Sequence, residues 1–369
     1  MGQRNSGFEK LVPLGTKKGN ESIVMFENYT QGILTSRDSW CYNSSRGVIA
    51  KNIKDSLGFY IKEKKKIAAN PLIRKLPDLD KVISNNAKRI SWSHNLKNYL
   101  LRGKEVKFDK RRIITSTYRP FIKQHLYFDR QLNERVYQIP SIFPDQKIEN
   151  KVICITGIGS RSFSCLMLDT VPSYDMHTKG QCFPLKLYEK IESKNNKQES
   201  FFTKDISQKG YKVTDGITEE GLAFIQSSYP KEDISKEDIF YYIYGLLHSE
   251  DYRSRYSDNL SKQLPRIACV KKSGDFWLFV DAGKKLAKLH LGYEKVKPYK
   301  VTYEGDHLDI ASLKPKDLYV TKMKFGPKKD KTTVVYNHKI TMQNIPLKAY
   351  GYIVTVSYTH LTLPTKRIV

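Results

Sequence analysis

The chain has 369 residues, of which 64 are Lys or Arg and 38 are Asp or Glu, so its formal net charge is +26 at pH 7. Hydrophobic residues make up 39% of the chain and aromatic residues 12%, which is enough apolar surface for packed cores and excludes a disordered basic tail. A charge of this size favours a polyanionic partner, either nucleic acid or an anionic membrane, and the length predicts two domains.

Several classes of protein are excluded by what the sequence lacks. No stretch approaches the ~20 consecutive apolar residues of a membrane span, and the first residues carry no apolar run of a signal peptide, so we expect a cytoplasmic protein. The cysteines are widely spaced and form no CxxC pair, which predicts neither a disulfide framework nor a zinc site. They are Cys41, Cys154, Cys165, Cys182 and Cys269.

Catalytic motifs are also missing. The chain has no GxxxxGK[ST] loop, no GxSxG elbow, no HExxH pair and no [DN]PP[YFW] methyltransferase motif. The sequence TGIGS at residues 156–160 follows an apolar run but lacks the third glycine of a dinucleotide loop, so it is interpreted as a turn. The eight histidines show no metal-ligand spacing. The chain by itself is not expected to be a catalyst, and no catalytic, metal or cofactor residue is predicted in it.

The first part of the chain is predicted to form strands followed by helices. Short apolar runs within residues 1–60 indicate strands with irregular connections. Apolar spacing predicts a helix over 55–66, which ends in the solvated run KEKKK, and another helix between residues 86 and 110, with Gly103 as its end.

Residues 110–130 are the part of the chain richest in both cations and aromatic rings. Guanidinium groups hold phosphates or guanine edges, and rings pack on sugars and bases, so this segment is a candidate nucleic-acid surface. The alternative is a buried strand at HLYF flanked by charged residues. For the aromatic rings this alternative is favoured, and for the cations both interpretations stay open. The candidate DNA contacts here are Arg112, Arg119, Lys123 and Arg130, and Arg37 is a further one in the earlier sequence TSRD.

From residue 151 the pattern becomes strand, turn, strand. Alternation at Phe163, Cys165 and Met167 predicts a half-buried strand. The strand ends carry side chains suited to base edges, because Arg matches guanine and Gln matches adenine, although each could also be ordinary surface. These candidates are Ser160, Arg161, Lys179 and Gln181. The polar stretch 191–200 predicts a loop.

The third part is predicted to be helical, near residues 217–228, 235–262 and 275–292. Ser235 and Asp238 form a capping box at the start of the second segment, and Pro265 ends it. From about residue 298 the sequence returns to short strands with basic turns such as residues 326–329.

These sequences together resemble one family. The early ones are SWCYN after TSRD, STYRPF with LYFDR, VYQIPSIFP, NKVICITGIG, FSCLMLDTVP and GQCFPL. The two longest are EDIFYYIYGLLHSEDYRSRYSDNLSKQLPRI and DFWLFVDAGKKLAKLHLGYE. Over residues 8–354 the chain is similar to the C-terminal part of type ISP restriction-modification enzymes, single-polypeptide bacterial systems often described as helicases.

The resemblance implies an α+β fold, with a mixed β-sheet target recognition domain and a helical subdomain. It implies a methyltransferase-tail or connector region at 1–145 and a target recognition domain at 146–354. The tail 355–369 departs from the family and is expected to be foreign sequence. The implied function is sequence-specific binding of double-stranded DNA. Adenine-N6 methyltransferase and ATP-dependent translocase and nuclease parts would lie upstream in the same polypeptide, where the family uses S-adenosylmethionine, ATP and Mg²⁺.

Two other functions stay open. One is a fragment with residual methyltransferase or nuclease activity. Asp129, Asp169 and Asp175 could ligate Mg²⁺, but no D…ExK triplet accompanies them. A structural interaction module would use its positive charge against an acidic protein partner. Gel-shift of the chain with duplex DNA separates that module from a DNA-binding domain.

Overall fold

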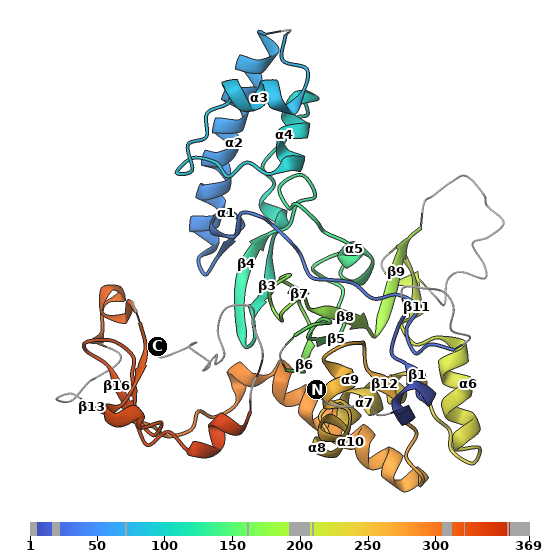
Figure 1. Cartoon of the computed structure of the whole chain (residues 1–369). Coiled ribbons are helices and arrows are strands. Elements are labelled where there is room, and N and C mark those ends of the chain that lie inside the picture. The colour runs from blue at the N-terminus through green and yellow to red at the C-terminus, as the bar shows by residue number, and fades with distance from the viewer. Residues whose placement is uncertain are drawn as a thin grey trace.

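The computed structural model describes residues 6–16, 23–70, 72–160, 162–191, 207–208, 210–304, 312–320, 322–352 and 354. Three subjects of sequence prediction lie outside these residues: Arg161, the predicted loop 191–200 after its first residue, and the tail 355–369. Figure 1 shows an arm of helices, a central body in which small sheets lie over a layer of helices, and a small β lobe near the C-terminus. This α+β architecture agrees with the fold class expected from the sequence.

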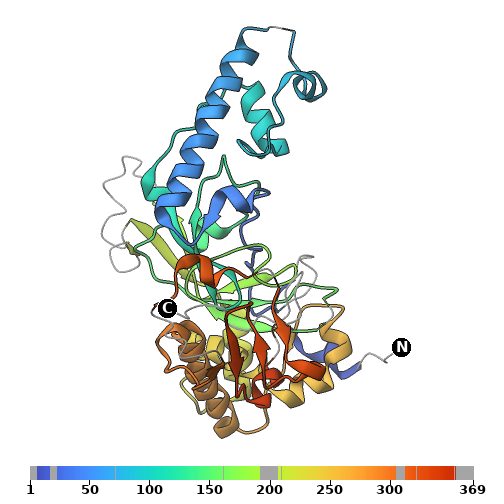
Figure 2. The ribbon, with the colours of Figure 1, turned by 90° about the vertical axis from the view of Figure 1, so that its left-hand side faces the viewer.

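The arm contains α2 (Arg46–Ala68), α3 (Leu76–Val82) and α4 (His94–Leu101), and rises away from the body in Figures 1 and 2. Helix α2 begins well before the predicted residue 55, because the Ser45 side chain accepts a hydrogen bond from the Val48 amide and caps the helix there. Helix α4 is much shorter than the predicted helix between 86 and 110. Ser93 caps it at one end and Gly103, at φ +61°, follows its other end.

A mixed sheet connects the arm to the body. Its strand order is β2 (Tyr42–Asn43), β4 (Ile122–Tyr127), β3 (Ile113–Arg119) and β7 (Val171–Pro172). Strands β3 and β4 form an antiparallel hairpin, whereas β7 runs parallel to β3. The short helices α1 (Asp38–Cys41) and α5 (Ile139–Ile142) lie in the chain before β2 and after β4.

The central sheet is buried on both faces. It consists of β5 (Val152–Ile155) between β6 (Cys165–Leu168) and β8 (Gln181–Pro184), and every residue of these strands is buried. Along β5, Val152 and Cys154 belong to one hydrophobic core, while Ile153 and Ile155 belong to a second. The prediction of a half-buried strand at β6 was therefore wrong. Both of its faces are covered, one by the arm side and one by the helical layer.

The helical layer contains α6 (Glu219–Ser228), α7 (Lys236–Leu246), α8 (Glu250–Arg255), α9 (Ser257–Leu260) and α10 (Ser273–Leu291). The capping box of Ser235 and Asp238 is present as predicted. The predicted segment 235–262 is divided into shorter helices, and Ser249 caps the second of these by accepting from the Tyr252 amide. Helix α7 is buried from Ile239 to Leu246 between the central sheet and α10.

The remaining strands form small antiparallel sheets. Strand β1 (Val12–Pro13) pairs with β12 (Arg266–Ile267), and β11 (Tyr211–Asp215) lies between β9 (Lys186–Lys190) and β10 (Ser207–Gln208). The C-terminal lobe has the order β13 (Thr302–Glu304), β16 (Thr341–Gln343), β15 (Val334–Val335) and β14 (Lys324–Phe325). Short 3-10 helices lie at Ser6–Lys10, Lys110–Arg112, Tyr293–Lys295, Pro315–Leu318, Pro327–Lys329 and Leu347–Gly351.

The first core lies across the domain boundary that the sequence predicted between residues 145 and 146. Tyr127 and Ile139, before that boundary, share this core with Cys154 and Leu168 after it. The two-domain division stays a prediction. Among the helices of the described ranges, none combines the length and apolar character needed to cross a bilayer.

Candidate nucleic-acid interface

Two open grooves meet at Asp169, the residue that follows β6. One has a volume of about 730 Å³ and lies beside β3, β7 and the loop after α5, and the other, of about 700 Å³, lies between Lys123 of β4 and the second half of α10. Among the described residues, nine cations line the two grooves, against the carboxylates of Asp145, Asp169 and Glu294. We call these cations the basic face: Arg46, Arg111, Arg112, Lys123, Lys147, Lys151, Lys284, Lys288 and Lys295.

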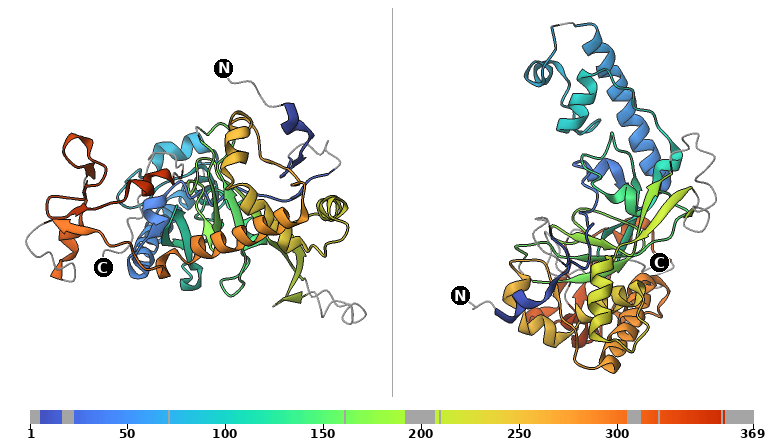
Figure 3. Two further views of the ribbon diagram at one scale, coloured as in Figure 1. Left: turned by 90° about the horizontal axis from the view of Figure 1, so that it is seen from below. Right: turned by 90° about the vertical axis from the view of Figure 1, so that its right-hand side faces the viewer.

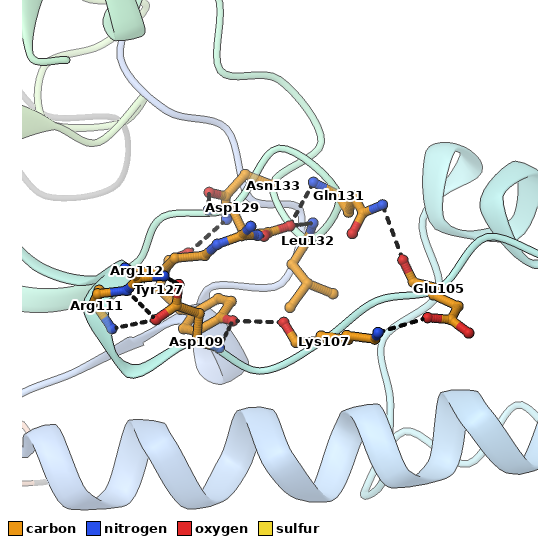
Figure 4. Close-up of polar contacts among 10 residues, drawn as sticks. All are labelled: Glu105, Lys107, Asp109, Arg111, Arg112, Tyr127, Asp129, Gln131, Leu132 and Asn133. Atoms are coloured by element: carbon orange, nitrogen blue, oxygen red, sulfur yellow. Dashed lines mark hydrogen bonds and ion pairs between the residues drawn. The ribbon is translucent and has the colours of Figure 1, made fainter. Parts of the chain in front are cut away.

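In the first groove, two arginines are held by acidic partners (Figure 4). Asp109 accepts hydrogen bonds from the backbone amide and guanidinium of Arg111, which lower the pKa of Asp109. The Arg111 side chain is still 90% exposed. Arg112 pairs with Asp129, whose side chain is fully buried, while the Arg112 side chain remains 44% exposed. Arg111 is therefore open to a ligand, and Arg112 is held in one position with part of its charge balanced.

The buried Asp129 is fixed by the turn that follows β4. Its Oδ1 accepts from the amides of Gln131 at 2.7 Å and Leu132 at 3.0 Å, and its own amide donates to the Asn133 side chain at 2.9 Å. Asn133 in turn donates to the carbonyl of Tyr127 at 3.2 Å. This network places Arg112 before any ligand arrives, which lowers the entropy lost on binding.

In the second groove, the lysines come from the sheet and from α10. The Lys123 ammonium lies 3.5 Å from the Asp169 carboxylate and 5.9 Å from the Tyr293 ring. Lys284 pairs with Asp238 at 2.9 Å, and this hydrogen bond raises the pKa of Lys284. Lys284 and Lys288 are four residues apart, so they lie on the same side of α10. Lys288 is exposed in the last turn of α10, and Lys295 is exposed in the 3-10 helix that follows it.

The described base-edge candidates, Ser160, Lys179 and Gln181, lie at the other end of the central sheet. In the register of β5 and β6, Ile155 pairs with Cys165 near the loops that carry Ser160 and Lys179, whereas Val152 pairs with Leu168 next to Asp169. The Ser160 hydroxyl donates to the Gly157 carbonyl at 2.6 Å, and Ser160 is buried.

The two loops at this end are packed closely together. A Cβ on Gly157 would lie 2.1 Å from the Lys179 carbonyl, so only glycine fits there. Gln181 is buried within β8, opposite Ile155. Of the described candidates in this group, only Lys179, at φ 52°, is exposed.

The other candidates differ in exposure. Arg37 is buried and donates to the carbonyls of Ser91 and Leu132 and to the hydroxyl of Ser93. Arg119, at the tip of the β3–β4 hairpin, lies 4.0 Å from the Tyr118 ring and donates to the Tyr118 carbonyl. Arg130 is exposed in the turn after β4.

The structure thus brings Arg112 and Lys123 together with cations that sequence reasoning missed. The missed members of the basic face are Arg46, Arg111, Lys147, Lys151, Lys284, Lys288 and Lys295. Lys284 and Lys288 could have been found from their four-residue spacing on a predicted helix. The others come from separate elements, which only the tertiary fold brings together. Within the described part of the chain, no cluster of three or more His, Cys, Asp or Glu side chains is arranged as a metal site.

Comparisons with known proteins agree with this fold. Residues 24–358 match the family described as the Type ISP C-terminal specificity domain. No curated protein matches the chain. A nuclease-deletion mutant of the Type ISP restriction-modification enzyme LlaGI, solved with a DNA substrate mimic, is similar with 30% identity and a TM-score of 0.74. The same values hold for the ATP-dependent Type ISP enzyme LlaBIII bound to DNA.

A third similar structure is a DrdV–DNA complex solved by cryoEM, with 27% identity and a TM-score of 0.76. The similarities cover 96% of this chain but 29% of the LlaGI chain, 21% of the LlaBIII chain and 33% of the DrdV chain. The chain therefore spans about a third or less of the proteins it resembles. The resemblance found in the sequence is confirmed: the chain belongs to the Type ISP C-terminal specificity domain family.

Proposed function

We propose that this chain is a target recognition module that binds double-stranded DNA sequence-specifically, with the phosphate backbone held on the basic face. The observation that carries the proposal is the excess of cations along two grooves that meet at Asp169. Such a surface attracts a polyanion by releasing its condensed counterions. The DNA present in the similar LlaGI, LlaBIII and DrdV structures supports duplex DNA as that polyanion.

Holding phosphates and reading bases require different side chains. Lysines such as Lys288 and Lys295 act as point charges on phosphates and carry no sequence information. Reading a base edge requires an accessible hydrogen-bonding side chain. Arg119, Arg130 and Lys179 are the described candidates with accessible side chains, at a hairpin tip, a turn and a loop. Arg161 is a further proposed base reader, whereas Gln181 is buried within β8 and is not accessible to a base edge. Arg37 and Ser160 are better explained as structural residues, since their polar groups are bonded within the fold.

The enzymatic steps belong, in this proposal, to upstream domains of a longer polypeptide. Methyl transfer from S-adenosylmethionine to adenine and ATP-dependent translocation with Mg²⁺ would take place there. The part played by this chain is to hold the duplex in one register, so that the target base is presented to those domains.

The proposal is tested by measuring the binding of this chain to a random pool of labelled duplexes. Fluorescence anisotropy follows this binding over a series of salt concentrations. The logarithm of the binding constant should fall linearly with the logarithm of the salt concentration. Replacing Lys288 and Lys295 together with alanine should weaken binding and make the slope shallower by about 1.8, since each phosphate contact contributes about 0.9.

The matched control is Lys271→Ala with Lys272→Ala, an exposed pair at the start of α10 that removes the same charge. This control should bind DNA nearly as the unchanged chain does. Equal weakening by both pairs would show that net charge alone drives binding and would overturn the placement of the interface. Binding with no salt dependence would overturn DNA binding through the basic face altogether.

A further inference from the structure

The C-terminal lobe carries a second cluster of cations, separate from the basic face. Five lysines lie between residues 322 and 331, all exposed, and we call this segment the lysine loop. They are Lys322, Lys324, Lys328, Lys329 and Lys331. Among the described residues, none of them forms an ion pair with a carboxylate.

The one carboxylate of this segment, Asp330, is used within the loop. It accepts hydrogen bonds from the Thr332 amide at 2.8 Å, the Thr332 hydroxyl at 2.7 Å and the Thr333 hydroxyl at 2.9 Å. These bonds lower the pKa of Asp330. The carboxylate therefore stabilises the turn, while the five exposed lysines have no ion-pair partner among the described residues. One of them, Lys331, has its ammonium 5.7 Å from the centre of the Tyr350 ring.

The backbone of the lysine loop is held in one conformation. The Gly326 amide donates to the carbonyls of Asp330 and Thr333, both at 3.0 Å, and the Lys329 amide donates to the Gly326 carbonyl at 3.1 Å. Lys328 and Lys329 have φ values of 54° and 64°, in the left-handed region that lysine rarely adopts. The lysines are therefore carried by a turn whose backbone conformation is fixed, which lowers the entropy cost of binding a ligand.

The lobe is attached at the edge of the basic face. Lys295 and Val296 line the second groove, and the chain continues from there into β13. Figure 3 shows α10 running toward the lobe, which stands away from the rest of the body. A duplex lying along the end of α10 would therefore extend toward the part of the molecule that carries the lysine loop.

We infer that the lysine loop is a second phosphate-binding site for the same duplex, and this inference rests on the proposed function. Lysines without ion-pair partners, on a turn of fixed backbone conformation, suit phosphate oxygens as ligands. A phosphate oxygen accepts a hydrogen bond from a lysine ammonium and does not require the planar guanidinium of an arginine. Phe325 lies in the same segment, is 39% exposed and packs edge-to-face on Tyr350 at 5.9 Å, and the exposed part of its ring provides a surface on which a sugar can pack. The duplex would be held at two places, by the basic face and by the lobe, which fixes its direction as well as its position.

The test replaces Lys328 and Lys329 with asparagine. Asparagine tolerates the left-handed conformation better than other residues with side chains, so the loop is preserved while two charges are removed. Anisotropy with a random-sequence duplex of about 40 base pairs, several helical turns long, should show roughly tenfold weaker binding at low salt and a slope shallower by about 1.8. An unchanged urea denaturation midpoint checks that the variant is folded. A second variant, Lys324→Gln with Lys331→Gln, should weaken binding in the same way.

The failure of this inference can be told from the failure of the proposed function. If the unchanged chain does not bind DNA with salt dependence, the proposed function fails. If it binds, and Lys288→Ala with Lys295→Ala weakens binding while both lysine-loop variants bind as the unchanged chain does, only this inference is overturned. The loop would then be a surface for an acidic protein segment. Equal weakening by Lys271→Asn with Lys272→Asn would also overturn it, because the effect would be one of net charge.

Discussion

At the scale of single residues, burial separates cations that hold the fold from cations that can hold a ligand. Arg37 and Arg130 were both candidates for DNA contacts. Arg37 is 5% exposed, and burial lowers the pKa of its guanidinium, an effect partly offset by the nearby carboxylate of Glu134. Its donors are taken by groups far along the chain, including Ser93 and the Leu132 carbonyl. Arg37 therefore connects the start of α1 to the arm and to the turn after β4.

Replacing Arg37 with alanine should lower the free energy of unfolding by about 2 to 4 kcal/mol, because it leaves buried acceptors without a partner. Urea denaturation measures this change, and the affinity of the folded fraction for DNA should be unaltered. Arg130→Ala removes an exposed side chain. Its free energy of unfolding should stay within about 0.5 kcal/mol of that of the unchanged chain, and its DNA binding should be weaker. Equal stability of the two variants would contradict the structural role of Arg37.

At the scale of elements, the contact between α7 and α10 depends on two glycines. A Cβ on Gly245 would lie 2.3 Å from the Phe279 carbonyl, and one on Gly283 would lie 2.1 Å from the Tyr241 carbonyl. The two helices can approach this closely only because neither glycine has a side chain. The contact positions α10, and with it Lys284 and the second groove.

Gly283→Ala should destabilise the protein by about 1 to 3 kcal/mol, because the added methyl group forces the helices apart. Gly274→Ala is the matched control in the same helix, where a Cβ would meet no atom within 4 Å. This change should leave stability unaltered or raise it by up to about 1 kcal/mol, since alanine favours the helix more than glycine does. Thermal unfolding of both variants measures the difference, and a Gly283→Ala variant as stable as Gly274→Ala would show that the helices do not need this contact.

At the scale of the whole molecule, a cluster of rings connects the β3–β4 hairpin, α10 and the chain that returns from the lobe. The ring of Phe121, at the hairpin tip, lies 5.7 Å from that of His290 and 5.3 Å from that of Tyr293. The Tyr352 hydroxyl lies 3.2 Å from His290 Nε2, and the Tyr244 hydroxyl bonds to His290 Nδ1. His290 is therefore hydrogen-bonded from both sides, between the helical layer and the end of the lobe.

This cluster predicts that stability falls in acid. Burial lowers the pKa of His290 to about 4, with further contributions from His248 and Arg253, and burial likewise lowers the pKa of His248 to about 4. As the pH falls from about 6.5 to about 4, the unfolded chain binds protons that the folded chain does not. The free energy of unfolding should therefore decrease, on the order of 3 kcal/mol for each histidine at pH 4.

Urea denaturation at pH 7 and pH 5 measures this loss. His290→Gln should show a smaller difference between the two pH values than the unchanged chain. His338→Gln, which changes an exposed histidine, should show the same difference as the unchanged chain. Identical pH dependence for His290→Gln and the unchanged chain would mean that His290 does not contribute to it.

How well the sequence predicted each feature depended on how local its cause is. The start of α7 was predicted correctly because the capping box lies within four residues, Ser235 to Asp238. The start of α2 was missed because the expected helix was taken from its apolar stripe alone and not from the Ser45 cap. Strand β6 of the central sheet was predicted to be half-buried because alternation along one strand does not reveal whether a second core covers its other face.

The sequence by itself determined the family, the positive charge and the main helices, since motifs, composition and capping are properties of neighbouring residues. Only the tertiary structure decided which cations share a surface. Arg112 and Lys123 lie on the basic face with the lysines of α10, whereas Arg37 is buried in the interior. Lys179 lies at the opposite end of the central sheet from Asp169. The physical reason is that desolvation and electrostatic attraction act through space. Their strength depends on burial and distance, which are set only when distant segments pack together.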